Sequence, residues 1–335
     1  MNANEQAKVA ERDAQRFRDV HDKIKREVQR FIVGQEPVLD AALTALFAGG
    51  HVMLEGVPGL GKTMLVKSIG QAVDVPFSRI QFTPDMMPAD IQGTNVLVET
   101  EGGGHELQFQ EGPLVSSLVL ADEINRATPR TQSALLEAMQ ERQISVGRRT
   151  IKLQEPYCVM ATQNPVEQEG TYALPEAQVD RFLVKLVVGY PSKDEELKII
   201  DRMAGLSAST DVQPATTPEE LLKMRQLLDT IYLDDKVKGY IVDLVFATRE
   251  PERVGLEQLK PLILYGASPR ASLALARTAR ARAFLEGRGF VTPQDVKAVG
   301  SMVLRHRVLT TYEAEAEGVD SEAVLRTVFD TVPVP

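Results

Sequence analysis

Gly56-Val-Pro-Gly-Leu-Gly61-Lys62-Thr63 is the stretch of sequence that decides the fold of this chain. It matches the pattern of a phosphate-binding loop, in which two glycines precede Lys and a hydroxyl residue. The apolar run Val52–Leu54 comes before it, and a helical pattern over Met64–Val73 comes after it. In this order the loop backbone wraps a phosphate, and the N-terminus of the helix adds its positive dipole end. The predicted nucleotide-binding residues of this stretch are Gly56, Val57, Pro58, Gly59, Leu60, Gly61, Lys62, Thr63 and Met64.

Two carboxylates further along the chain complete a predicted metal and hydrolysis site. Lys62 should reach the β- and γ-phosphates, and Thr63 should place its hydroxyl on Mg²⁺. The apolar run Leu118–Ala121 ends in Asp122 and Glu123, which fits a site at the carboxyl edge of a parallel sheet. Adjacent side chains of a strand point to opposite sides, so the two acids can take different roles. We expect Asp122 to hold Mg²⁺ through water and Glu123 to polarise the attacking water as a general base.

Three further polar residues are candidates for the same chemistry. Asn164 follows the apolar run Val159–Ala161 and could contact the γ-phosphate or fix the attacking water, although Asn-Pro is also ordinary turn chemistry. Arg181 precedes a strand-like segment, and Arg270 stands in the first turn of a helix that Ser268 caps. A cation there opposes the helix dipole, so an anion such as a γ-phosphate would compensate it. From the residues alone, solvated salt bridges remain an equal alternative for both arginines.

The pattern of apolar residues predicts two domains. Between residues 31 and 190, short apolar runs alternate with helical segments, which predicts a mostly parallel sheet with helices on both faces. The expected strands are His51–Leu54, Ser78–Phe82, Leu118–Ala121, Tyr157–Ala161 and Arg181–Val188. Two predicted β-hairpins interrupt the alternation, one near residues 95–110 around Gly102–Gly104 and one near residues 143–153 around Gly147–Arg149. Capping hydroxyls before prolines, at Thr217, Ser268 and Thr292, predict a smaller all-α domain over residues 191–335.

The first thirty residues form a third segment. Phe17, Val20, Ile24, Val28 and Phe31 recur at steps of three and four, so residues 1–30 are predicted to form an amphipathic helix. Its apolar face would pack on the body of the protein or, alternatively, bind a partner.

Composition limits the classes of function. The 335 residues are 43% hydrophobic and 25% charged, typical of a water-soluble chain of two folding units, with no apolar run of the roughly 20 residues that span a bilayer. The charged start shows no secretory signal, so a cytoplasmic location is expected. Four scattered histidines and the single Cys158 form no metal cluster, and Cys158 is expected in the core. A net charge of −9 disfavours a large nucleic-acid surface.

The order of these elements is similar to that of the AAA+ superfamily, and the amino-acid sequence around them resembles that of its MoxR branch. The most specific runs are Leu120-Ala-Asp-Glu-Ile-Asn-Arg-Ala127 and Gly266-Ala-Ser-Pro-Arg-Ala271. Further matching runs are Ile32–Gln35, Arg79–Asp85, Gln132–Gln140, Ala161–Pro165 and Leu174–Phe182. Together they cover nearly everything from about residue 31 to residue 305, and the first thirty residues fall outside the resemblance.

The resemblance implies an AAA+ core, a helical lid domain, and hydrolysis of ATP to ADP with Mg²⁺. It implies that Asn164 takes the sensor-1 place, Arg270 the nucleotide-contacting sensor-2 place, and Arg181 the place of an arginine finger that enters a neighbouring subunit's site. Val33 and Gly34 would lie against adenine. Family members form rings, commonly hexamers, and the two hairpins match the helix-2 and pre-sensor-1 insertions of this branch.

The leading functional expectation is therefore a chaperone-like ATPase that remodels or activates a protein client, possibly one with a von Willebrand factor A domain. A nucleic-acid motor of the helicase type is a second reading. Acidic net charge argues against it and Arg148-Arg149 in the second hairpin argues for it. The ATPase subunit of a metal chelatase, which shares this architecture, is a third. No membrane insertion is expected.

Overall fold

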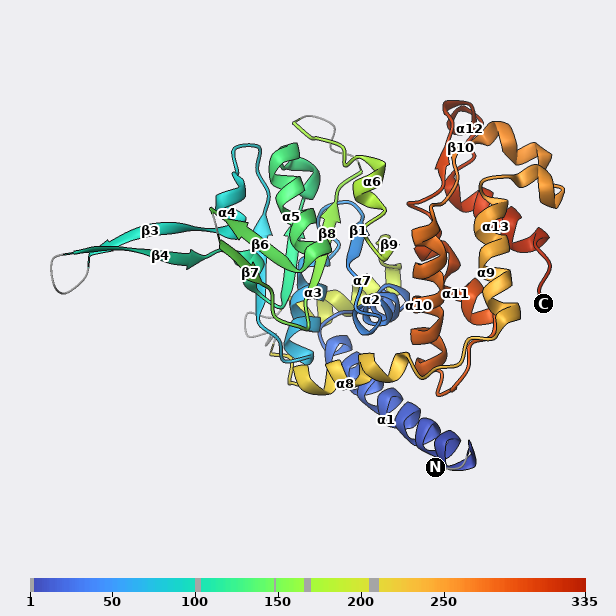
Figure 1. Cartoon of the computed structure of the whole chain (residues 1–335), viewed down its shortest axis with the longest axis horizontal. Coiled ribbons are helices and arrows are strands. Elements are labelled where there is room, and N and C mark those ends of the chain that lie inside the picture. The colour runs from blue at the N-terminus through green and yellow to red at the C-terminus, as the bar shows by residue number, and fades with distance from the viewer. Residues whose placement is uncertain (1–2, 100–103, 148, 166–169, 205–210) are drawn as a thin grey trace.

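A computed structural model describes residues 3–99, 104–147, 149–165, 170–204 and 211–335 (Figure 1). Five strands form one parallel sheet in the order β2-β5-β8-β1-β9. Their bounds are β1 (Val52–Glu55), β2 (Phe77–Gln81), β5 (Leu118–Asp122), β8 (Cys158–Gln163) and β9 (Val184–Val187). The predicted parallel sheet is confirmed, and its order brings the ends of β1, β5 and β8 side by side.

Each face of the sheet carries its own apolar core, because alternate strand residues point to opposite sides. Val52 and Leu54 of β1 belong to one buried cluster, whereas Met53 between them belongs to the other. Helices α2 (Glu36–Phe47) and α3 (Lys62–Ala72) contribute to the first cluster, and α5 (Pro129–Glu141) contributes to the second. The helices on both faces are therefore confirmed.

Two antiparallel hairpins branch from this core, as the sequence predicts. One pairs β3 (Gly93–Glu99) with β4 (His105–Glu111) after the short α4 (Pro88–Gln92), and it extends far from the body in Figure 1. The other pairs β6 (Gln143–Val146) with β7 (Arg149–Lys152). Gly102, Gly103 and Arg148, which the sequence assigns to the two turns, lie outside the described residues.

The strand expected over Arg181–Val188 begins three residues late, at Val184. Arg181 and Phe182 instead close a helical turn after α6 (Glu176–Val179): the Arg181 N–H donates to Gln178 O and the Phe182 N–H donates to Val179 O. The Leu183 N–H already donates to His51 O beside β1. The backbone is therefore already engaged where the apolar pattern suggests a strand.

The C-terminal helices start where the sequence predicts. Thr217, Ser268 and Thr292 each accept a backbone N–H at the start of α8, α10 and α11. The helices are α7 (Lys193–Met203), α8 (Pro218–Leu228), α9 (Asp235–Ala247), α10 (Pro269–Leu285), α11 (Pro293–Leu304), α12 (Tyr312–Ala316) and α13 (Ser321–Thr331). Short 3-10 helices cover Pro113–Val115, Ile124–Arg126, Pro251–Val254 and Glu257–Leu262.

Two features of this region differ from a simple all-α domain. A short antiparallel ladder joins β10 (Ile263–Tyr265) to β11 (Leu309–Thr310), so the lid is helical with one small sheet. In addition, α8 lies against the core, where Arg225 donates two hydrogen bonds to Leu46 O of α2. Helices α9 to α13 form the separate bundle on the right of Figure 1. The boundary near residue 191 stays a prediction.

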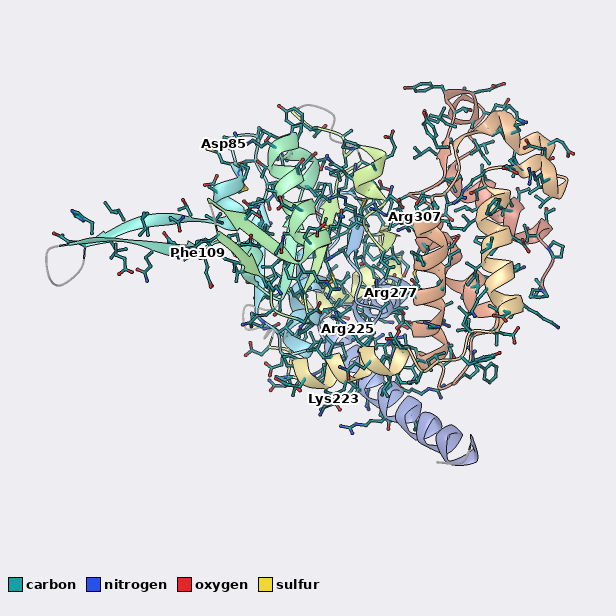
Figure 2. The ribbon with its side chains drawn as sticks, viewed as in Figure 1. Asp85, Phe109, Lys223, Arg225, Arg277 and Arg307 are labelled. Atoms are coloured by element: carbon teal, nitrogen blue, oxygen red, sulfur yellow. The ribbon has the colours of Figure 1, made fainter. Side chains whose placement is uncertain are left out.

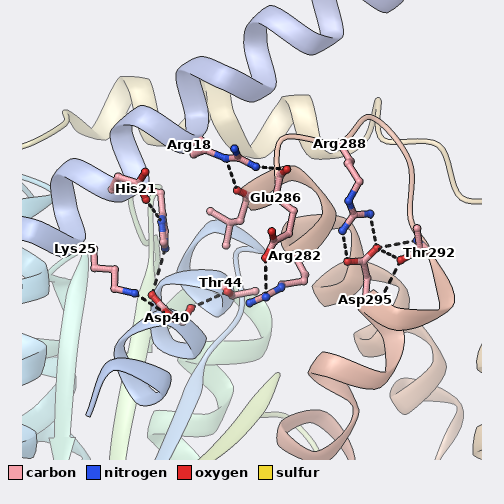
Figure 3. A network of polar contacts seen from close by, with 12 residues as sticks. Arg18, His21, Lys25, Asp40, Thr44, Arg282, Glu286, Arg288, Thr292 and Asp295 are labelled. Carbon is pink, nitrogen blue, oxygen red and sulfur yellow. Dashed lines mark hydrogen bonds and ion pairs between the residues drawn. The ribbon is translucent and has the colours of Figure 1, made fainter. Parts of the chain in front are cut away.

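The N-terminal helix α1 (Ala3–Gln29) joins both parts of the molecule. The Phe17 ring lies 4.5 Å from that of Phe47 in α2 and 4.3 Å from that of Phe284 in α10, measured between centroids. Figure 3 shows the polar contacts beside it: Arg18 donates to Leu285 O and Glu286 O. Ile24 and Val28 are fully buried, which supports the packing role of the apolar face. Among the described helices, none is both long and apolar enough to cross a membrane.

Candidate nucleotide-binding site

The loop between β1 and α3 has the backbone that a phosphate cradle requires. Gly59 and Gly61 have φ of 85° and 76°, in the left-handed region that a side chain rarely adopts. Gly61 is also the N-cap of α3, and it has no side chain with which to cap the first turn. That turn carries no acidic residue either. The free N–H groups and the helix dipole therefore face outward as a site for an anion.

Lys62 lies in the loop as predicted. Its ammonium donates to Gly56 O and Val57 O, both at 2.7 Å. Burial lowers the pKa of Lys62, while the carboxylates of Asp122 and Glu123 act in the opposite direction. The ammonium is thus held where two carboxylates and the start of α3 converge.

Thr63 and Asp122 lie together although 59 residues separate them in sequence. The Thr63 hydroxyl donates to Asp122 Oδ2 at 3.3 Å. The other carboxylate oxygen accepts from the Thr162 hydroxyl at 2.5 Å, so Asp122, itself buried, is tied to β8 as well. A hydroxyl beside a carboxylate fits Mg²⁺, which takes one or two protein oxygens and completes its shell with phosphate and water. Among the described residues no group of three or more His, Cys, Asp or Glu could hold a metal ion.

Glu123 diverges from Asp122, but not for the reason that strand alternation suggests. β5 ends at Asp122, and Glu123 adopts the left-handed conformation with φ of 57°. Its N–H donates to the Thr162 hydroxyl at 2.8 Å, which fixes this turn. Its carboxylate accepts from Gln81 at 2.9 Å and from Arg126 at 3.2 Å. The turn, and not the pleat, therefore directs the two acids to different positions.

These residues line one cavity of about 530 Å³. Asn164 belongs to its lining, as predicted, and is buried. The lining residues are Pro58, Gly59, Leu60, Gly61, Lys62, Thr63, Met64, Lys67, Arg79, Asp122, Glu123, Thr162, Gln163 and Asn164. Gly56 and Val57 are not among them, and their carbonyls accept hydrogen bonds from Lys62.

Sequence reasoning missed Arg79 and Gln81. Both lie on one face of β2, whose register pairs Gln81 with Asp122 of β5. Arg79 Nη2 is 2.7 Å from Asp122 Oδ2, and Gln81 contacts Glu123. Period-two spacing of polar residues at the end of a strand was the available signal. It did not suffice, because only the sheet order makes β2 the neighbour of β5.

A second, apolar cavity of about 200 Å³ adjoins the loop. Val33 lines it, and Gly34, which is not itself a lining residue, lies between the lining residues Val33 and Gln35. Its apolar lining includes Phe31, Ile32, Val33, Leu60, Met64, Ile199 and Met203. Leu60 and Met64 line both cavities, so a flat apolar base and a phosphate chain can be held side by side.

Arg181 and Arg270 lie elsewhere. Both line a separate cavity of about 300 Å³, which shares no lining residue with the phosphate cavity. Arg181 donates to Leu136 O at 3.1 Å, and its Nε is buried without a partner. The Arg270 side chain is half exposed. The fold brings the two arginines together, but not with the phosphate loop of their own chain.

A parallel core with this loop, two carboxylates at the neighbouring strand end and a helical lid defines a P-loop nucleotide-binding protein of the AAA class. The family described as "ATPase family associated with various cellular activities (AAA)" matches residues 51–184, and the AAA lid domain matches residues 258–328. Chaperone MoxR1 of Mycobacterium tuberculosis is 47% identical over 92% of this chain and 81% of its own length. Protein MoxR of Methylorubrum extorquens is 31% identical over 95% and 96%. The chain belongs to the MoxR family of AAA ATPases.

A solved structure from Cytophaga hutchinsonii supports the same assignment. It superposes with a TM-score of 0.92 at 41% identity, and the match covers 98% of this chain and 99% of that one. The expected core and lid are therefore confirmed.

Proposed function

We propose that this protein hydrolyses ATP to ADP and phosphate, with the triphosphate at the start of α3. The observation that carries the proposal is the convergence of the Thr63 hydroxyl on Asp122 at 3.3 Å, beside Glu123 and an uncapped helix N-terminus. A triphosphate needs positive backbone dipoles and a cation for its charge, and a water needs a base. All of these are present in one cavity.

Each residue then has a defined role. Lys62 moves from the loop carbonyls to the β- and γ-phosphates, and Thr63 and Asp122 hold Mg²⁺. When bound there, the metal would supply positive charge against the phosphates during transfer. Glu123 takes a proton from the attacking water, and Asn164 orients that water or the γ-phosphate. The apolar cavity beside Val33 takes the adenine.

We also propose that the active species is a ring, in analogy with the family, and that it is a hexamer. The position of Arg181 and Arg270, away from the phosphate loop of their own chain, supports their acting on the nucleotide of the neighbouring subunit. An arginine finger is worth about 10³–10⁵-fold in turnover in related NTPases. Hydrolysis would then require assembly.

For the work that hydrolysis drives, we propose chaperone-like remodelling of a protein client in the cytoplasm, with von Willebrand factor A domain proteins as the class to test first. One relative is named a chaperone. The net charge of −9 disfavours the nucleic-acid motor. Salt-sensitive stimulation of ATP turnover by DNA would favour the nucleic-acid motor instead. A porphyrin-chelating partner protein would favour the ATPase subunit of a metal chelatase.

The decisive experiment mixes two inactive variants and measures ATP turnover. Arg181→Ala keeps its own site but gives its neighbour no finger, whereas Glu123→Gln keeps the finger but lacks the base. Mixed rings contain interfaces with an intact site beside an intact finger, so part of the activity should return. If the mixture stays as inactive as its components, a finger acting between subunits is excluded.

A further inference from the structure

Asp180, the residue before Arg181, connects that arginine's segment to the lid. Its Oδ1 accepts from Arg307 Nε at 2.7 Å, and its Oδ2 accepts from the Ser268 hydroxyl at 2.8 Å. Arg270 Nη1 lies 3.9 Å from the same Oδ2. One carboxylate in the core domain therefore contacts three lid side chains, which come from the start of α10 and from the residues after α11.

Arg307 strengthens this junction through the backbone. Its guanidinium donates to Phe182 O at 2.6 Å, to Leu183 O at 3.1 Å and to Asp180 O at 3.2 Å. Only 3% of its side chain is exposed, and Figure 2 shows it between the core and the lid. A buried guanidinium is stable only when a carboxylate and several acceptors satisfy it. Asp180 supplies that carboxylate, so residues 180–183 are fixed to the lid.

Ser268 connects Asp180 to Arg270. Its hydroxyl donates to Asp180 and at the same time accepts the Arg270 N–H at 3.2 Å, as the N-cap of α10. A hydroxyl can make both bonds because it is a donor and an acceptor. Asp180 is thus adjacent to Arg181 in sequence, and the Ser268 hydroxyl links its carboxylate to the backbone N–H of Arg270.

Within the described residues, neither arginine side chain donates a hydrogen bond to a carboxylate. Arg181 makes one hydrogen bond to a carbonyl, and the ion pair of Arg270 spans 3.9 Å. Both side chains face the same cavity of about 300 Å³. The spacing between them is therefore set by the backbone that Asp180, Arg307 and Ser268 connect.

We propose that Asp180 is a positioning residue for hydrolysis in the neighbouring subunit. Its carboxylate, paired with Arg307 and Ser268, locks the finger segment to the N-terminus of α10, so that Arg181 and Arg270 meet one triphosphate together. This inference rests on the proposed function, in which both arginines act across the subunit interface.

The test is complementation with Asp180→Asn, which keeps the size of the side chain and removes its charge. A displacement of about 1 Å can cost on the order of 10²-fold in rate, so we expect kcat to fall 10- to 100-fold while ATP affinity changes less than about twofold. Mixing with Glu123→Gln should restore turnover, because that subunit presents a correctly positioned Arg181 to the intact nucleotide site of its neighbour. Mixing with Arg181→Ala should restore nothing, because neither variant can present a correctly positioned Arg181.

If Asp180→Asn does not fold, which circular dichroism would reveal, a second variant tests the same contact from the lid side. Ser268→Gly removes the hydroxyl contact to Asp180, yet glycine is itself among the residues that serve well as an N-cap. We expect a smaller loss of kcat with the same complementation pattern. Thr217→Gly, the same change at the N-cap of α8, is the matched control and should hydrolyse ATP normally.

The outcomes distinguish the positioning role of Asp180 from the action of Arg181 between subunits. Normal kcat in both Asp180→Asn and Ser268→Gly, or rescue of either by Arg181→Ala, would overturn the positioning role alone. Failure of Arg181→Ala to recover with Glu123→Gln would exclude a finger that acts between subunits, and this inference with it.

Discussion

Arg79 of β2 forms an ion pair with Asp122 at the end of β5, with 2.7 Å between Nη2 and Oδ2. The same oxygen accepts from Thr63, the other residue assigned to Mg²⁺. The guanidinium therefore competes for the carboxylate that the metal needs. We expect Arg79→Gln to reach half-maximal ATP turnover at a several-fold lower Mg²⁺ concentration, because Asp122 loses its protein counter-ion. A Mg²⁺ titration of turnover measures this, and an unchanged or higher requirement would contradict the competition.

Replacing Glu123 by Gln should separate binding from hydrolysis. The phosphate loop and the adenine cavity are unaltered, so ATP should bind with an affinity close to that of the unmodified protein. Loss of a general base costs about 10²–10⁴-fold in rate, and kcat should fall by that factor. Calorimetry for binding and phosphate release for turnover provide the two measurements. Glu141→Gln, an exposed change at the end of α5, is the control, and near-normal turnover in Glu123→Gln would remove the residue from the mechanism.

Phe17 should be a major contributor to stability, because its ring is fully buried between Phe47 of the core and Phe284 of the lid. Phe17→Ala removes both contacts and leaves a cavity, which costs about 3–5 kcal/mol in the free energy of unfolding. Urea denaturation measures the change. The exposed neighbour Arg16→Ala should alter it by less than about 1 kcal/mol. A loss of that small size in Phe17→Ala would mean that α1 is dispensable for joining the two parts.

Acid should destabilise the protein through His51. Burial lowers its pKa to about 4, and in the fold its Nδ1 accepts the Val159 N–H while Nε2 contacts Met139 O. The unfolded chain binds this proton near pH 6.5, so unfolding takes up a proton between pH 6.5 and about 4. The free energy of unfolding should fall through that window as pH decreases, by at most about 1.4 kcal/mol per pH unit from this group.

Burial also lowers the pKa of His21 and of His306, so both act in the same direction. His51→Gln should reduce the pH dependence of stability, and His105→Gln, on the exposed hairpin, should leave it unchanged. Denaturation curves at pH 7, 6 and 5 compare the variants. Equal slopes for His51→Gln and the unmodified protein would refute the assignment.

Cys158 should be inert in the folded protein. It is fully buried in β8, and burial raises the pKa of its thiol to about 12. The thiolate is the reactive form, so alkylation at pH 8 should be far slower than for a free thiol and should accelerate only on unfolding. Mass spectrometry after treatment with iodoacetamide, with and without urea, reports the difference. Rapid modification without urea would show that β8 opens under native conditions.

The nature of the elements could be predicted from local sequence, because periodicity and turn chemistry are short-range properties. The loop around Lys62, the strand ending at Asp122 and the capped helices are all encoded within a few residues. The segment at Arg181 shows the limit of such reasoning. Its apolar pattern is that of a strand, yet hydrogen bonds back to α6 and contacts from Arg307 decide its conformation.

The sequence by itself determined the class of this protein and singled out the phosphate loop, the two carboxylates and the two arginines as candidate site residues. Only the tertiary structure decided which of them meet. Sheet order put β2 beside β5 and so brought Arg79 and Gln81 to the acids, while packing of the lid put Arg181 and Arg270 in a cavity of their own. The physical reason is that contacts between distant segments depend on how sheets and helices stack, and no local pattern in the chain carries that information.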